Sequence, residues 1–147
     1  MAKTVPLRSE VPVELTWDLA SIFRSDQAWE EAFADVEGQL DAVRQLQGSL
    51  GRSARDLYLG LVLRDQVGEA LDRVAEYANR RHYEDMGNME YAAYADRVTG
   101  LASAFAAATS FFAPEILEIA PEQLAQFFLD EPALAVYRHL IETITVH

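Results

Sequence analysis

The sequence of 147 residues contains no cysteine, which excludes a disulfide framework and any thiolate metal site. An export signal is not expected, because prolines and glutamates interrupt residues 1–16. No apolar run approaches the length of a membrane span, so no membrane partner is expected either. The lack of cysteine also fits a reducing compartment. We therefore expect a soluble, cytoplasmic protein.

Basic residues are scarce, since 12 lysines and arginines stand against 24 acidic residues, giving a formal net charge of -12. Such a charge repels phosphate backbones, so a nucleic-acid partner is not expected. Between Thr99 and Tyr137 there is no lysine or arginine, whereas the segment contains Glu115, Glu118, Glu122, Asp130 and Glu131. We interpret this segment as a solubilising acidic face. The alternative is attraction of cationic ligands or a basic partner surface.

Histidine is scarce as well, with only His82, His139 and His147 in the chain. Zinc hydrolases commonly place two imidazoles on one helical face in an H-E-x-x-H pattern, and these three are too far apart in sequence. A di-iron bundle is excluded because no histidine has a glutamate three residues before it. We expect a helix-end histidine at 82, favoured by the helix dipole, and a hydrogen-bonding histidine at 139.

Two further patterns have the composition of binding sites without the full spacing. Carboxylates four residues apart, Asp65 with Glu69 and Glu118 with Glu122, can face a hard cation, but alone they are solvated helix-surface acids. The segment 48–53 places glycines before a helix start, where an anion can sit, yet no lysine follows and the P-loop spacing is absent. The sequence therefore predicts no catalytic, cofactor-binding or metal-binding residue in this chain.

The apolar pattern that is present has the period of helices throughout. The length suits one domain, divided here into an extended segment 1–16 and a helical domain 17–147. Ser25 or Asp26 can cap a first amphipathic helix that ends near Gly48. A capping box at Ser53 and Asp56 starts the next stretch, in which the phase shifts around Gly60 and Gly68; this predicts one kinked helix or two abutting ones.

A third helix is predicted to start at Asn88, and its second half, 101–113, carries no charge and is rich in alanine. We expect it to be the most buried helix, and Pro114 either ends it or begins the next turn. Prolines at 121 and 132 suit first helical turns, predicting short helices over 122–128 and 133 to about 142. No period-two alternation is sustained. The predicted fold is an all-α, antiparallel helical bundle of about five to seven helices.

Four blocks of sequence carry a resemblance to a known family. The first comprises Trp17-Asp18-Leu19, Ile22-Phe23, Ser25-Asp26 and Ala28-Trp29. The later ones are Tyr77-Ala78 with Arg81, Glu84-Asp85, Asn88 and Tyr91; Ser110-Phe111-Phe112 with Pro114-Glu115; and Tyr137-Arg138-His139 with Glu142. In order and spacing they resemble the oligoendopeptidase F family of zinc metallopeptidases. Met86-Gly87 departs from the polar pair usual before Asn88, and Arg24 stands where proline is common.

The resemblance implies a parent enzyme that cleaves oligopeptides with a zinc ion bound by residues beyond this region. This chain then corresponds to the non-catalytic N-terminal helical domain, which covers the catalytic cleft and restricts access to oligopeptides. Its partners are the missing catalytic domain and, through the parent, the oligopeptide substrate. Val146-His147 resembles the beginning of the family's next segment, so a fragment or isolated domain is expected.

Two alternatives remain open from the residues alone. One is a free-standing helical protein-protein interaction module, and the other is self-association of the isolated domain through an exposed apolar face. A polar cluster of Tyr77, Arg81, Asp85 and Asn88 at a helix end is a plausible place to meet the missing domain. The interpretation that we favour is a local capping and ion-pair network in which Arg81 pairs with Asp85 four residues later, so the cluster is not predicted as a site.

Overall fold

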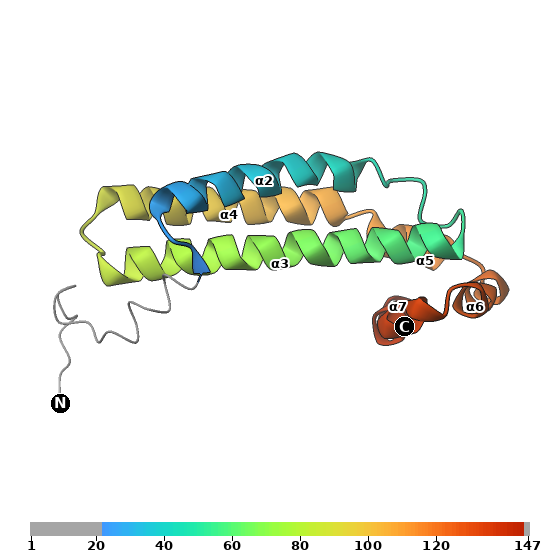
Figure 1. Ribbon diagram of the computed structural model, residues 1–147. Coiled ribbons are helices and arrows are strands. Elements are labelled where there is room, and N and C mark those ends of the chain that lie inside the picture. The colour runs from blue at the N-terminus through green and yellow to red at the C-terminus, as the bar shows by residue number, and fades with distance from the viewer. Residues whose placement is uncertain (1–21, 146–147) are drawn as a thin grey trace, which may run out of the picture. The chain divides into compact units, whose positions relative to one another are not determined.

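The structure, a computed structural model, describes residues 22–145, and within that range it is helical without any strand (Figure 1). The all-α prediction is confirmed. The elements are α2 (Asp26–Arg44), α3 (Ala54–Glu84), α4 (Met89–Thr109), α5 (Phe112–Glu118), α6 (Pro121–Asp130), the 3-10 helix η2 (Pro132–Tyr137) and α7 (Arg138–Thr145). The predicted extended segment 1–16, Trp17 and the last two residues lie outside the described range.

Side-chain caps start the three long helices where the sequence placed them. Ser25 Oγ accepts a hydrogen bond from the backbone N–H of Ala28 at 3.1 Å, before α2. Ser53 Oγ accepts one from Asp56 at 3.0 Å, before α3. Asn88 Oδ1 accepts one from Glu90 at 2.8 Å, before α4. Each bond satisfies an amide that the helix itself leaves without a partner, so these starts are fixed locally.

Helix α3 is a single helix of 31 residues, continuous through both glycines at which a break had been considered. Gly60 is needed for close packing, because a Cβ built there would lie only 2.6 Å from Cδ2 of the fully buried Leu50. At Gly68 the nearest atom to such a Cβ is a ring carbon of Phe105, at 3.5 Å. The shift in apolar phase therefore marks glycines that let neighbours approach the helix.

The described residues form two compact units, each of which we describe by itself. The first contains residues up to Gly38 together with 69–104, and the second contains 39–68 together with 105 onward. In the first unit the beginning of α2, the end of α3 and most of α4 lie side by side (Figure 1). In the second, α5 and η2 both contact α7, and α6 contacts η2.

An aromatic cluster forms the core of the first unit. Trp29 has no exposed surface, and its indole Nε1 donates a hydrogen bond to the backbone carbonyl of Val74 at 2.8 Å. Its ring stacks on Tyr94 with centroids 4.2 Å apart and planes 5° from parallel. One side chain of α2 thus contacts both α3 and α4.

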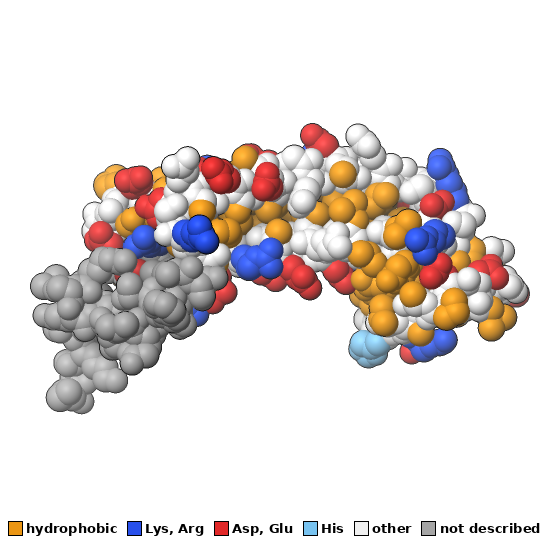
Figure 2. Space-filling view, in the orientation of Figure 1, with side chains coloured by type: hydrophobic (Ala, Val, Ile, Leu, Met, Phe, Trp, Pro, Cys, Tyr) orange, Lys and Arg blue, Asp and Glu red, His pale blue; other side chains and the backbone are white. Residues whose placement is uncertain are grey.

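Apolar side chains from every element of the second unit share its core. The loop before α3 contributes Leu50, and the fully or almost fully buried remainder includes Leu57, Leu61, Phe112, Ile116, Phe127, Leu134 and Ile141. Other large apolar side chains remain exposed in this unit, including Leu129 at 75% and Val136 at 76%. Figure 2 shows hydrophobic side chains gathered over this part of the molecule, at the right of the view.

The prediction that the third helix is the most buried is wrong. In α4 the buried side chains form one stripe, Tyr94, Val98, Leu101 and Ala108, while Ala102, Ser103, Ala106 and Ala107 are exposed. Alanine exposes little apolar area, so an uncharged alanine-rich helix does not need to face a core on all sides. The absence of charged residues in the second half of α4 therefore does not indicate burial.

A related expectation, that no apolar run approaches a membrane span, also needs correction. The stretch Met89–Glu118 is long and apolar enough by composition, and 22% of its most apolar window is buried. The turn at Ser110 and Phe111 separates α4 from α5 within it. The uncharged helix from Val98 to Thr109 is about 18 Å long against roughly 30 Å of bilayer core. One such stretch is weak evidence for a span.

Replacing Gly60 by alanine is expected to destabilise the protein relative to Gly38→Ala, although both changes gain about 0.5–1 kcal/mol of helix propensity. A Cβ at residue 38 meets no atom within 4 Å, whereas at residue 60 it displaces Leu50. Such overpacking costs about 1–3 kcal/mol. Urea unfolding measures both variants, and equal stabilities would contradict the packing role of Gly60.

Candidate functional site

Of the polar cluster predicted at the end of α3, Tyr77 and Arg81 meet at Asp26, a residue from another helix, whereas Asp85 and Asn88 do not join them. The Asp26 carboxylate accepts hydrogen bonds from the hydroxyls of Tyr77 at 2.7 Å and Tyr91 at 2.9 Å. Arg81 Nε lies 3.4 Å from the same carboxylate and donates to the Tyr77 hydroxyl at 3.3 Å. We call these four residues the Asp26 cluster. It ties α2, α3 and α4 together within the first unit.

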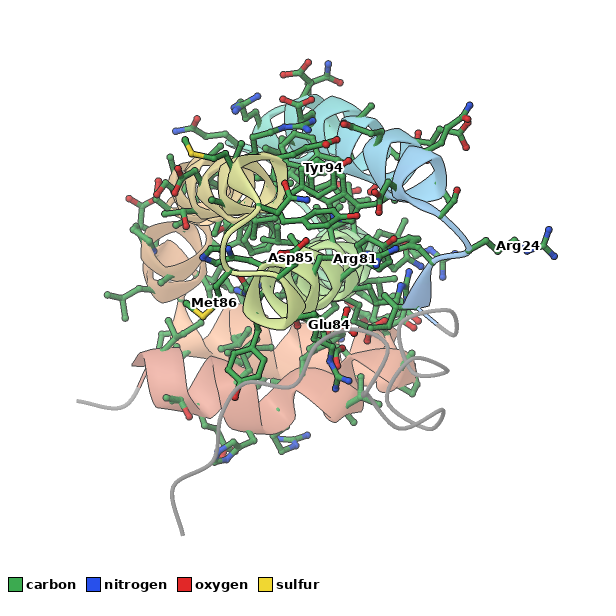
Figure 3. All side chains as sticks on the ribbon, turned by 90° about the vertical axis from the view of Figure 1, so that its left-hand side faces the viewer. Arg24, Arg81, Glu84, Asp85, Met86 and Tyr94 are labelled. Atoms are coloured by element: carbon green, nitrogen blue, oxygen red, sulfur yellow. The ribbon has the colours of Figure 1, made fainter. Side chains whose placement is uncertain are left out.

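The structure gives Arg81 a different partner from the Asp85 considered in the sequence. Asp85 accepts a hydrogen bond from the Asn88 side chain at 3.4 Å, in the turn between α3 and α4. The guanidinium of Arg81 lies over the rings of Tyr77 and Tyr91, 5.4 Å and 5.3 Å from their centroids. Figure 3 looks onto this end of the unit and shows Arg24 pointing away from the helices. Local spacing could not reveal a partner 55 residues away, the interval from Asp26 to Arg81.

A second ion pair covers the aromatic core of the first unit. Arg97 on α4 makes two hydrogen bonds to Glu30 on α2, at 2.7 Å and 2.9 Å. Its guanidinium lies 4.8 Å from the ring centroid of Trp29 and 4.5 Å from that of Phe33. The hydrogen bonds from Arg97 lower the pKa of Glu30. Both charges are used within the fold, which favours packing over chemistry.

Three tyrosines of this unit, Tyr77, Tyr91 and Tyr94, have a raised pKa. Burial, then the hydrogen bond to Asp26, raises the pKa of Tyr77 and of Tyr91. Burial also raises the pKa of Tyr94, to about 12. A protonated phenol that donates to a carboxylate is a structural donor. It has neither the lowered pKa nor the free proton acceptor that an activated group requires.

In the second unit, Glu115 of α5 occupies the anion position considered at the glycine loop. Its carboxylate accepts hydrogen bonds from the backbone N–H groups of Gly48 at 2.6 Å and Leu50 at 3.4 Å. Gly48 has a φ of +88°, a conformation that glycine adopts without strain. The loop therefore binds a carboxylate of its own chain, and the predicted helix cap at Ser53 follows it.

A groove of about 910 Å³ runs beside this loop, within the second unit. Its walls come from the loop, the turn between α4 and α5, α5, the link after it and the start of α6: Gln47, Gly48, Gly51, Ser110, Phe111, Pro114, Glu115, Glu118, Ile119, Ala120 and Gln123. The charged side chains in this lining are both glutamates. In the sequence, Glu115 and Glu118 lie in an acidic segment for which attraction of cationic ligands was one interpretation, and Glu118 belongs to one of the carboxylate pairs, but nothing local indicated a groove.

Of the histidines, the structure describes His82 and His139, and neither joins carboxylates in a metal site within residues 22–145. Among residues 22–145 no group of three or more histidine, aspartate or glutamate side chains can hold a metal ion. His82 has a buried Nδ1 without a hydrogen-bond partner in the described part, and His139 on α7 is exposed. His147 lies outside the described residues.

One carboxylate of the pairs considered in the sequence, Asp65, accepts a hydrogen bond from Tyr137. The pKa of Tyr137 is raised to about 12 by burial and then by that bond.

Comparison with known proteins identifies relatives far longer than this chain. No protein-family profile matches. The Bacillus subtilis oligopeptidase PepF is 40% identical over 144 residues, which is 98% of this chain and 22% of the relative. The plasmid-encoded oligoendopeptidase F of Lactococcus lactis subsp. cremoris is 27% identical over 138 residues, 93% of this chain and 23% of the relative.

Two crystal structures share the fold. Oligoendopeptidase-F from Enterococcus faecium superposes with a TM-score of 0.72 and 32% identity, over 82% of this chain and 24% of that one. A putative peptidase from Chlamydophila abortus gives 0.78 and 27%, over 97% and 24%. Fold and sequence together define a helical region that this chain shares with these peptidases. The chain belongs to the oligoendopeptidase F family and spans less than a quarter of the length of these relatives.

Replacing Asp26 by alanine is expected to lower the free energy of unfolding by about 1–3 kcal/mol, because two tyrosine hydroxyls and Arg81 lose their common acceptor. The matched control is Asp35→Ala, at an exposed position on the same helix. Chemical denaturation measures both. An equal effect at the two positions would contradict the tethering role of Asp26.

Replacing Tyr94 by phenylalanine is expected to reduce the loss of stability at alkaline pH. The pKa of Tyr94 is about 10 in the unfolded chain and about 12 in the fold. The stability that protonated Tyr94 contributes is therefore complete below pH ~10 and is lost progressively up to about pH 12. Each such group adds a slope of at most about 1.4 kcal/mol per pH unit. Urea unfolding between pH 9 and 12 compares this variant with Tyr83→Phe, whose side chain is 71% exposed. Identical slopes in the two variants would contradict the assignment.

Proposed function

We propose that this chain is the non-catalytic helical domain of an oligoendopeptidase F-like metallopeptidase. The observation that carries the proposal is the 40% identity over 98% of the chain, confined to 22% of the relative's length. A region of that size supplies a part of the enzyme, and the zinc and its ligands belong to the remainder. The internal use of Asp26, Glu30, Arg81 and Arg97 supports a structural role for these charges.

The role we propose for this domain is to cover the catalytic cleft and restrict access to oligopeptides. A helical layer suits this role because its side chains pack rigidly while its outer surface stays polar. The exposed uncharged face of α4, with Ala102, Ala106 and Ala107, supports packing against another part of the enzyme, since small side chains allow close approach. The proposed partners are the catalytic domain and, through it, a peptide. A cytoplasmic location is proposed with it.

A chimera tests the proposal. Residues of this chain replace the matching 144-residue segment of the Bacillus subtilis relative, and a second variant lacks the segment. The chimera is expected to cleave a short fluorogenic peptide while leaving a long unfolded protein such as reduced casein intact. If the segment is dispensable for both behaviours, the deletion variant will match the chimera, and the cleft-covering role is wrong.

The isolated 147-residue chain is the control in this experiment. It is expected to bind no stoichiometric zinc by elemental analysis and to cleave neither substrate. Zinc-dependent cleavage by the isolated chain would contradict the proposal.

A second candidate function, a free-standing interaction module, is favoured by one observation. Tyr83, Met86 and Met89 at the α3–α4 turn are 71%, 60% and 84% exposed. A chimera that fails to assemble into a soluble enzyme would favour this alternative.

A further inference from the structure

The lining of the groove in the second unit is partly apolar and partly polar. Pro114, Ile119 and Ala120 provide apolar surface, and Gly51 adds no side chain. Gln47 and Gln123 add amide groups that both donate and accept hydrogen bonds. Small apolar walls with a few convergent polar groups are typical of ligand-binding grooves.

The charges of the groove are of one sign. Its ionisable lining residues are Glu115 and Glu118, and the sequence has no lysine or arginine between Thr99 and Tyr137. The two glutamates differ in how the fold uses them. Glu115 is held by the backbone amides of Gly48 and Leu50, so its carboxylate is fixed in place beside the groove.

Glu118 is placed where the fold itself does not favour a negative charge. It is the last residue of α5, and the carbonyl end of a helix carries partial negative charge. Its side chain is exposed and lines the groove. A cation bound there gains from both the carboxylate and the free carbonyls of the helix end.

We propose that this groove binds an extended oligopeptide through a lysine or arginine side chain of the peptide. The methylene stem lies along Pro114 and Ile119, and the cationic head reaches Glu118 with Glu115 behind it. Such a side chain combines an apolar stem with a charged end, which matches the walls and the charge of the groove. The inference rests on the proposed function in taking a peptide as the ligand, and it assigns a peptide-binding site outside the catalytic centre.

The test is a titration of the isotope-labelled 147-residue chain, followed by amide chemical shifts. The probes are three acetylated and amidated alanine hexapeptides with a central Lys, Glu or norleucine residue. The Lys peptide is expected to shift amides of 47–51 and 110–123 and to bind at least fivefold more tightly than the Glu peptide. Raising the salt from 0.05 M to 0.5 M is expected to weaken it, because the contact is ionic.

Two matched pairs of variants locate the site. Glu118→Gln is expected to weaken Lys-peptide binding about two- to fivefold, whereas Glu122→Gln, exposed on α6 and outside the lining, leaves it unchanged. Gly51→Leu is expected to abolish binding by filling the groove. A Cβ at residue 51 makes only an ordinary contact of 3.6 Å with Ile119, and circular dichroism checks that the leucine variant is folded. Gly38→Leu, with open space around residue 38, is its control.

The proposal is overturned if the Lys and Glu peptides bind alike, if the shifts map to other residues, or if Gly51→Leu binds as the parent does. Absence of any binding by the folded chain, with helicity verified by circular dichroism, also overturns it. These outcomes are independent of the chimera. A chimera that excludes long proteins while the groove binds no peptide removes this site and leaves the proposed function in place.

Discussion

The first unit depends on the buried hydrogen bond from the Trp29 indole to the carbonyl of Val74. A fully buried indole N–H without an acceptor costs about 1–3 kcal/mol. The position of α2 along α3 that keeps this hydrogen bond is therefore favoured. The same ring stacks on Tyr94, which sets the position of α4 as well. Asp26 lies three residues before Trp29, and this packing brings its carboxylate to the hydroxyls of Tyr77 and Tyr91. The polar cluster therefore follows from the position of the aromatic core.

Tertiary contacts explain the spacing of the four blocks that resemble oligoendopeptidase F. Residues of the first two blocks, Asp26, Tyr77, Arg81 and Tyr91, meet in one cluster of the first unit. In the second unit, Glu115 of the third block holds the loop at Gly48. From the fourth, Tyr137 donates to Asp65 and Arg138 lies over the ring of Phe128. The spacing that identified the family is thus the spacing of tertiary contacts in this region. These contacts belong to the part of the family's fold that this chain shares with its relatives.

What the sequence could predict was local. Caps at Ser25, Ser53 and Asn88 act within three residues, and their positions were read correctly because the signal and its effect share one turn of chain. The partner of Arg81 was missed because Asp26 comes from another helix, and a residue four positions away offered a simpler explanation. The burial of α4 was overestimated because alanine occurs both in protein cores and on protein surfaces, so an alanine-rich segment does not indicate burial. The groove beside α5 could not be predicted, since its walls come from several separate segments.

The carboxylates of this acidic chain differ in what the fold does with them. Asp26 stands in the first turn of α2, where the helix dipole favours a negative charge, and three side chains donate to or pair with it. Glu115 stands in the first turn of α5 and accepts two backbone hydrogen bonds. Each is fully used in holding its unit together. Glu118 stands at the opposite end of α5, where the dipole opposes it, on the wall of an open groove. In the proposed peptide site, Glu118 is therefore the carboxylate that contacts the ligand, whereas Asp26 and Glu115 stabilise the fold.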